Sequence, residues 1–139
     1  MQGDTGFGDI LELVREASVQ ELDFDPYNAT HIQTELGKLG LGTDQIVEIP
    51  QTVKHLSGPM YAVRDLLKAG HLHHDGNPVM TWCASNVVSR EDANENLFPR
   101  KAGRALKIDG YVAMVIALSR AAVHGPEGSV YDGRGVVVV

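Results

Sequence analysis

The chain has 139 residues, of which 43% are hydrophobic, enough for one domain with a buried core. Its formal net charge of −6 at pH 7 argues against a protein that binds nucleic acid over its whole surface, because phosphate binding needs clustered Lys and Arg. A single cysteine, Cys83, excludes a disulfide framework, and no apolar run reaches the roughly 20 residues of a membrane span, so a cytoplasmic protein is expected.

The first 50 residues alternate between helical and extended patterns. Residues 7–19 carry apolar side chains at helical spacing and predict an amphipathic helix. Its inward stripe is Ile10, Leu13, Val14 and Ala17. Residues 20–25 and 45–49 predict two short strands, separated by a helix over 29–39 that Asn28 is expected to cap. This order predicts an α/β layer with a parallel pair of strands.

The middle of the chain predicts two helices and a hairpin. Ser57 is expected to cap a helix that ends at Gly70, and a second helix is expected over 79–88. Residues 87–91 and 97–101 predict the two arms of a hairpin, because the segment between them consists of residues that favour turns.

An apolar helix over 107–120 carries one acid, Asp109, at its head. Helical spacing from Asp109 leads to Val112, Ala113 and Ile116, so the carboxylate is expected on an apolar face. A poorly hydrated acid there needs backbone N–H groups, a cation or a metal ion. The alternative is an acid that only favours the helix dipole.

Four basic residues precede this helix within eight positions. They are Arg100, Lys101, Arg104 and Lys107. A local basic strip on an acidic domain can meet a phosphate backbone, and a solvated loop is the alternative.

Three histidines, His71, His73 and His74, precede Cys83 and suggest zinc. Structural zinc sites usually have paired ligands at both ends of their spacing, and Cys83 has no such partner in the sequence. A zinc-binding regulator is therefore an alternative to the functions considered below.

Short polar pieces follow one another along the chain in a specific order. They are Asp23–Ala29, Leu56–Met60, His74–Val79 with Trp82 and Asn86, Asp92–Asn94 with Lys101, Lys107–Gly110, and Ser129–Tyr131. This ordered set resembles the C-terminal part of the large terminase subunit of tailed bacteriophages. The resemblance implies a ribonuclease H-like endonuclease that uses Mg²⁺ or Mn²⁺ to cut concatemeric phage DNA for packaging.

The resemblance also implies site residues. By position, Asp25 resembles the second catalytic and metal-binding acid of the family, and Asp109 resembles the third. His74 and Asn77 are candidates to support the site. Two-metal phosphodiester cleavage needs carboxylates from different chain segments, which an acid at a strand end and an acid at a helix head can supply. The four basic residues would contact DNA phosphates without reading sequence.

Two family features have no counterpart in the chain. No segment matches the phosphate-binding loop of the family's ATPase domain, and no strand carries a first catalytic acid. We expect a truncated nuclease domain over 1–125, with a partial ribonuclease H-like α/β fold that lacks the first strands. Residues 126–139 are expected to form a C-terminal tail with an apolar end, Val136–Val139.

Such a segment would have weak or no activity alone. The resemblance implies as partners double-stranded phage DNA, the terminase ATPase portion, the small terminase subunit and the portal. The alternative is a non-catalytic prophage remnant that binds a partner, or forms a homo-oligomer, through the sheet edge left open by the missing strands.

Overall fold

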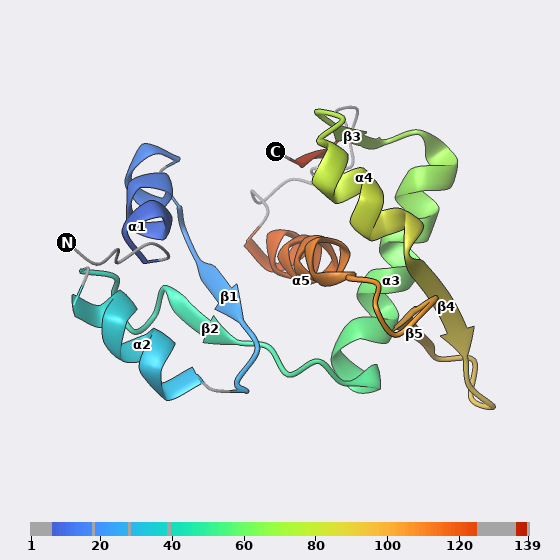
Figure 1. Cartoon of the computed structure of the whole chain (residues 1–139), viewed down its shortest axis with the longest axis horizontal. Coiled ribbons are helices and arrows are strands. Elements are labelled where there is room, and N and C mark those ends of the chain that lie inside the picture. Colours follow the sequence, from blue (N-terminus) through green and yellow to red (C-terminus); the bar gives the residue numbers. More distant parts are fainter. Residues whose placement is uncertain (1–6, 18, 28, 39, 125–135, 139) are drawn as a thin grey trace. The chain divides into compact units, whose positions relative to one another are not determined.

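The computed structural model describes residues 7–17, 19–27, 29–38, 40–124 and 136–138. The chain divides into two compact units, Met1–Pro50 and Gln51–Val139 (Figure 1). Mixed helices and short strands build both units, in agreement with the predicted α/β class. No helix among the described residues is both long and apolar enough to cross a membrane.

The first unit contains two helices and a two-stranded parallel sheet. In chain order, its elements are α1 (Phe7–Glu16), β1 (Leu22–Phe24), α2 (Ala29–Lys38) and β2 (Ile46–Glu48). Strands β1 and β2 pair in parallel, with Asp23 opposite Val47, which confirms the predicted order and pairing. A crossover helix between the strands is the connection that parallel pairing requires.

The small core of this unit centres on Leu36 of α2, which is 1% exposed. The apolar stripe of α1 is less buried than its pattern predicts. Leu13 is 63% exposed, and Ile10 is also exposed. The predicted cap Asn28 lies outside the described residues.

The second unit begins with the long helix α3 (Val53–Ala69). Its N-cap is Thr52, so the prediction that Ser57 caps this helix is wrong. Ser57 instead lies inside the helix, is 8% exposed, and its Oγ accepts the Leu97 N–H at 3.1 Å. Gly70 ends the helix as predicted, in the left-handed conformation with φ of 69° that favours glycine.

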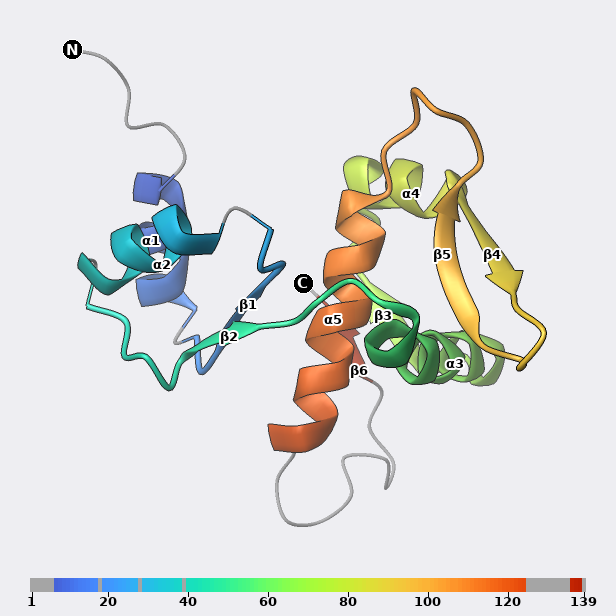
Figure 2. The same ribbon diagram turned by 90° about the horizontal axis from the view of Figure 1, so that it is seen from below.

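Three further elements complete the core of the second unit with α3. They are α4 (Pro78–Ser85), β5 (Leu97–Lys101) and α5 (Asp109–His124). Helix α5 contacts both α3 and α4, and β5 contacts α3 (Figures 1 and 2). Leu56, Val63 and Val115 are almost fully buried at these contacts. The apolar sequence of α5 is thus explained by packing on two sides.

Strands β4 (Val87–Glu91) and β5 form the predicted antiparallel hairpin. In its turn, the Asp92 carboxylate accepts the backbone N–H groups of Asn94 and Asn96 at 2.8 and 3.0 Å, and the Asn96 side-chain amide as well. These hydrogen bonds, led by the Asn96 amide, lower the pKa of Asp92. The Tyr61 hydroxyl donates to the Glu95 carbonyl oxygen and so ties the turn to α3.

A second parallel pair joins β3 (Leu72–His74) to β6 (Val136–Val138). Residues 126–135 and 139 of the expected tail lie outside the described residues. The apolar end of that tail is thus a sheet strand at residues 136–138, where its β-branched side chains favour extended structure.

Candidate functional site

Asp109 is the first residue of α5 and is exposed to solvent. The expectation of a poorly hydrated carboxylate is therefore wrong. Ala113 and Ala117, one and two turns further on, are exposed too, whereas Val112 and Ile116 are buried. Asp109 therefore lies on the exposed face of α5, together with Ala113 and Ala117. The buried face, which includes Val112 and Ile116, lies on another side of the helix. An exposed acid at a helix start is favoured by the dipole and is accessible to a cation.

The head of α5 is packed closely against α4 at Gly110. A Cβ atom at this position would lie 3.4 Å from both the Cys83 Sγ and the Met80 Sδ. Glycine therefore allows the first turn of α5 to approach α4 closely. This contact fixes the helix end that carries Asp109.

The loop before α5 is held by Asn86, which caps the C-terminus of α4. The Asn86 carbonyl oxygen accepts the Ala102 N–H at 2.8 Å, and its side-chain amide donates to the Lys107 carbonyl oxygen at 2.9 Å. Asn86 is only 6% exposed. Asn86, a single buried residue, thus forms hydrogen bonds with both ends of the loop over 102–107. Its burial was not evident from the sequence, although polar residues at helix ends commonly bond to backbone.

All four basic residues of the predicted strip are exposed, but they do not share one surface. Arg100 and Lys101 are neighbours on β5, and strand geometry directs them to opposite faces of the hairpin. Arg104 and Lys107 lie in the loop that Asn86 holds. Figure 2 shows this loop between β5 and α5. The basic strip of the sequence therefore divides into a hairpin part and a loop part.

Asp25 directly follows β1 in the first unit and is partly exposed. Its Oδ1 accepts the Tyr27 N–H at 3.0 Å, which orients the carboxylate in a local turn. Tyr27 itself is 83% exposed. Asp25 and Asp109 belong to different units, and their pairing stays a prediction.

The family model described as "Terminase large subunit, endonuclease domain" matches residues 7–125. The chain belongs to this terminase family. The match confirms the resemblance drawn from the ordered polar pieces, and it covers segments of both units.

Two curated relatives and a solved structure are similar to the chain. The chain is 36% identical over 129 residues to Protein YmfN of Escherichia coli strain K12, covering 88% of this chain and 28% of the relative. It is 28% identical over 113 residues to the terminase large subunit of Enterobacteria phage HK97, covering 81% of this chain and 22% of the relative. The chain therefore spans about a quarter of the length of these relatives.

The crystal structure of the HK97 bacteriophage large terminase matches with a TM-score of 0.73 at 28% identity. This match covers 83% of the present chain and 24% of the HK97 chain. The fold prediction, a partial ribonuclease H-like α/β fold, is confirmed by this similarity.

The two predicted supporting residues of this terminase domain have local structural contacts. Asn77 is the N-cap of α4, and its Oδ1 accepts the N–H groups of Val79 and Met80 at 2.9 and 3.2 Å. His74 accepts the Gly76 N–H through Nδ1 at 3.0 Å. Both side chains line a cavity of about 680 Å³ bordered by β3, α4 and α5.

This cavity is mainly apolar and also reaches the first turn of α5. Gly110 and Tyr111 line it together with Met80. Partial burial raises the pKa of the Tyr111 hydroxyl. His74 and Asn77 line the same cavity as Gly110 and Tyr111, the two residues that follow Asp109 in α5, although Asp109 itself does not line it.

The zinc alternative finds no support in the described part of the chain. There, no three His, Cys, Asp or Glu side chains are grouped so that they could hold a metal ion. Cys83 is buried in α4, whereas His71, His73 and His74 are exposed. The four residues therefore face different environments.

Proposed function

We propose that this chain is the nuclease segment of a phage terminase large subunit, which cuts concatemeric DNA during genome packaging in the cytoplasm of a bacterial host. The observation that carries the proposal is the family match over residues 7–125. The 0.73 TM-score to the HK97 large terminase supports the same assignment at the level of the fold.

Asp25 and Asp109 are the residues proposed to bind Mg²⁺ or Mn²⁺ and to act in catalysis. Both offer carboxylate oxygens, the ligands that these hard cations prefer, and both are at least partly accessible to solvent. Mg²⁺ is commonly bound by one or two carboxylates together with water and substrate phosphates, so two acids suit it. When bound, such ions activate water and stabilise the leaving oxygen of a phosphodiester.

The loop over 102–107 is proposed to hold the DNA backbone next to the head of α5. Arg104 and Lys107 are exposed on it, and Lys107 is two residues from Asp109 in the sequence. Contacts of this kind position a duplex without reading its sequence. By holding the Lys107 carbonyl oxygen, Asn86 limits the movement of this loop relative to α5.

The remaining activities of a terminase would come from other polypeptide segments or proteins. The ATPase portion, the small terminase subunit and the portal are the proposed partners, together with double-stranded phage DNA. With two acids of the proposed set of three, this segment alone is expected to cut DNA weakly or not at all.

Manganese calorimetry tests the metal site without depending on activity. Wild-type chain, Asp109→Asn and Asp65→Asn should be titrated with Mn²⁺ at low ionic strength. Asp65 is a matched control, since it is an exposed acid of the same unit that forms an ion pair with its neighbour Arg64. The proposal expects binding that is lost in Asp109→Asn and retained in Asp65→Asn.

Equal binding by all three chains would show that Asp109 is not a ligand. Because Asp109 also favours the helix dipole, circular dichroism should first establish that Asp109→Asn remains folded. An Asp25→Asn variant in the same series tests the second acid, and nicking of supercoiled plasmid in Mn²⁺ measures any remaining cleavage.

A non-catalytic module that self-associates or binds a partner is the second candidate. The exposed apolar side chains of α1, Leu13 above all, favour it, because such side chains gain stability when a partner covers them. Light scattering over a range of protein concentrations should then show a mass that rises above one chain. A constant monomer mass together with Mn²⁺ binding would contradict this alternative.

A further inference from the structure

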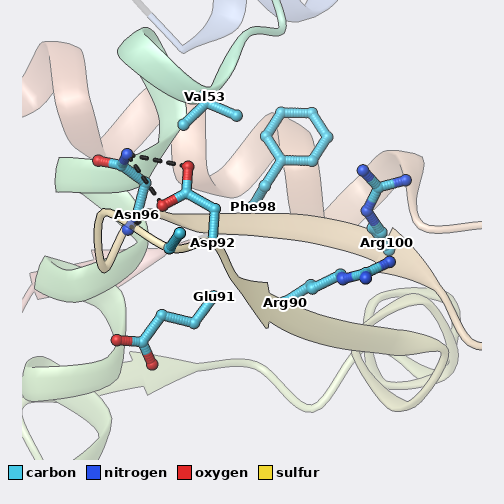
Figure 3. Close-up of a pocket in the computed structure, with 8 residues that line it drawn as sticks. Val53, Arg90, Glu91, Asp92, Asn96, Phe98 and Arg100 are labelled. Atoms are coloured by element: carbon cyan, nitrogen blue, oxygen red, sulfur yellow. Dashed lines mark hydrogen bonds between the residues drawn. The ribbon is translucent and has the colours of Figure 1, made fainter.

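The hairpin of β4 and β5 borders a cavity of about 510 Å³ (Figure 3). Phe98 and Arg100, which line it, alternate along β5 with the buried Leu97 and Pro99 and so lie on the opposite face of the strand. Arg90, Phe98 and Arg100 line this cavity along the strands. Asp92 and Asn96 line it at the turn. Of this group, only Arg100 belongs to the basic strip predicted from the sequence, and the proposed function places DNA on Arg104 and Lys107 of that strip.

Strand register explains why these side chains come together. Arg90 lies opposite Phe98, and Arg100 lies opposite Val88. Arg90 and Arg100 are therefore diagonal neighbours on one face of an antiparallel pair, close enough for long side chains to meet. Figure 3 shows both guanidinium groups at the same end of the cavity, away from Asp92 and Asn96.

No acid in the cavity neutralises the two arginines. Among the described residues, ion pairs join Lys38 to Glu35 and Arg64 to Asp65, and neither pair includes Arg90 or Arg100. The acids near the cavity are otherwise engaged or directed elsewhere. Asp92 accepts N–H groups within the turn, and Glu91 points away from the arginines in Figure 3.

The ring of Phe98 lies within cation–π range of one of these cations. The Arg100 guanidinium carbon lies 5.9 Å from the centre of the Phe98 ring. A guanidinium that lies over a ring still presents its N–H donors in its own plane, where they suit phosphate oxygens. Two adjacent, unneutralised guanidinium groups repel each other and gain most from a bound anion.

We propose that Arg90 and Arg100 bind the phosphodiester backbone of duplex DNA on this face of the hairpin. The proposal rests on the proposed function and adds Arg90 and Arg100, and with them the hairpin face, to the DNA-binding surface. An extended polyanion is favoured over a small phosphate because β5 leads directly into the loop that carries Arg104 and Lys107. Positive charge therefore continues along the chain from the hairpin to the head of α5.

The salt dependence of DNA binding tests this placement. The full 139-residue chain should be titrated with a fluorescent 20-base-pair duplex in EDTA over a series of salt concentrations, with anisotropy as the readout. The variants are Arg90→Gln, Arg100→Gln and Lys107→Gln, with Arg64→Gln as the control. Arg64 is a matched control because it also lies over an aromatic ring, that of Tyr61, but already has Asp65 as a partner.

Each lost phosphate contact should reduce the slope of log affinity against log salt by about 0.9 and lower affinity at 0.1 M salt by about eightfold. We expect this for Arg90→Gln and Arg100→Gln and no change in slope for Arg64→Gln. Inorganic phosphate at constant ionic strength should not displace the duplex.

Three results would overturn the inference. An unchanged slope for Arg90→Gln beside a reduced slope for Lys107→Gln would confine DNA to the loop and leave the proposed function standing. Displacement by inorganic phosphate would identify a site for small anions. Failure of the wild-type chain to bind duplex at low salt would refute DNA binding as a whole, and the Mn²⁺ titration would then decide the metal site separately.

Discussion

The Asn86→Ala substitution would remove the hydrogen bond that holds the loop before α5. The Asn86 amide donates to the Lys107 carbonyl oxygen at 2.9 Å from a nearly buried position. A buried acceptor that loses its donor costs about 1–3 kcal/mol. Lys107 is exposed, so water can partly replace the donor, and we expect the free energy of unfolding to fall by about 1–2 kcal/mol, in the lower part of that range.

Thermal unfolding followed by circular dichroism measures the global effect. For a chain of this size, each kcal/mol lowers the melting temperature by roughly 4 °C, so Asn86→Ala should melt about 4–8 °C below wild type. Asn94→Ala is the control, because Asn94 is exposed and bonds to Asp92 through a backbone N–H that alanine retains.

Hydrogen exchange separates local loosening from global destabilisation. Amides over 102–108 should exchange faster in Asn86→Ala than the global loss of stability requires, since this variant opens the loop without unfolding the unit. A melting temperature within 1–2 °C of wild type, with unchanged exchange over 102–108, would show that Asn86 does not hold the loop in solution.

Two further substitutions test the hairpin and its contact with α3. Ser57→Ala should lower the free energy of unfolding by about 1–3 kcal/mol, because the buried N–H of Leu97 loses its acceptor; a change below about 0.5 kcal/mol in urea unfolding would contradict that role. Glu95 has a φ of 62°, which costs most residues about 1–2 kcal/mol and which asparagine tolerates better. Glu95→Asn should therefore raise the melting temperature by a few degrees, and a lower value would show that the side chain of Glu95 stabilises the turn.

Local periodicity was sufficient to predict most of the elements. Helix α2 and the parallel strands on either side of it followed from patterns within a few residues, as did the hairpin with its turn of Asp and Asn. These features depend on which side chains alternate or recur, and the sequence contains that information directly.

Features that depend on distant contacts were not predictable in this way. Serine is a common helix-cap residue, but the actual partner of Ser57 is Leu97, which lies 40 residues further along the chain. The strand at 136–138 pairs with Leu72–His74, a segment whose histidines gave a metal-binding interpretation instead of a strand. Asp109 was placed on the wrong face because its exposure depends on which stripe of α5 meets α3 and α4.

The candidate site shows the same division between sequence and structure. The order of the short polar segments along the chain was sufficient to predict the family, because the identity and order of residues can be read without knowing how the side chains pack. The surface of the basic strip was not predictable in this way, because a run of basic residues in the sequence does not show on which face of the fold each side chain lies. Strand alternation separates Arg100 from Lys101 and brings Arg100 next to Arg90, which lies on the other arm of the hairpin.

The hairpin, the loop and α5 form one continuous path in the second unit. Asn86 links that path to the end of α4 through Ala102 and Lys107, close to where Gly110 packs against Cys83 and Met80. A phosphate backbone bound by Arg90 and Arg100 would therefore contact the hairpin, which continues through the loop held by Asn86 to Asp109 at the start of α5. Because the loop is fixed at both ends, binding there need not first order it, and less of the electrostatic attraction is lost to conformational entropy.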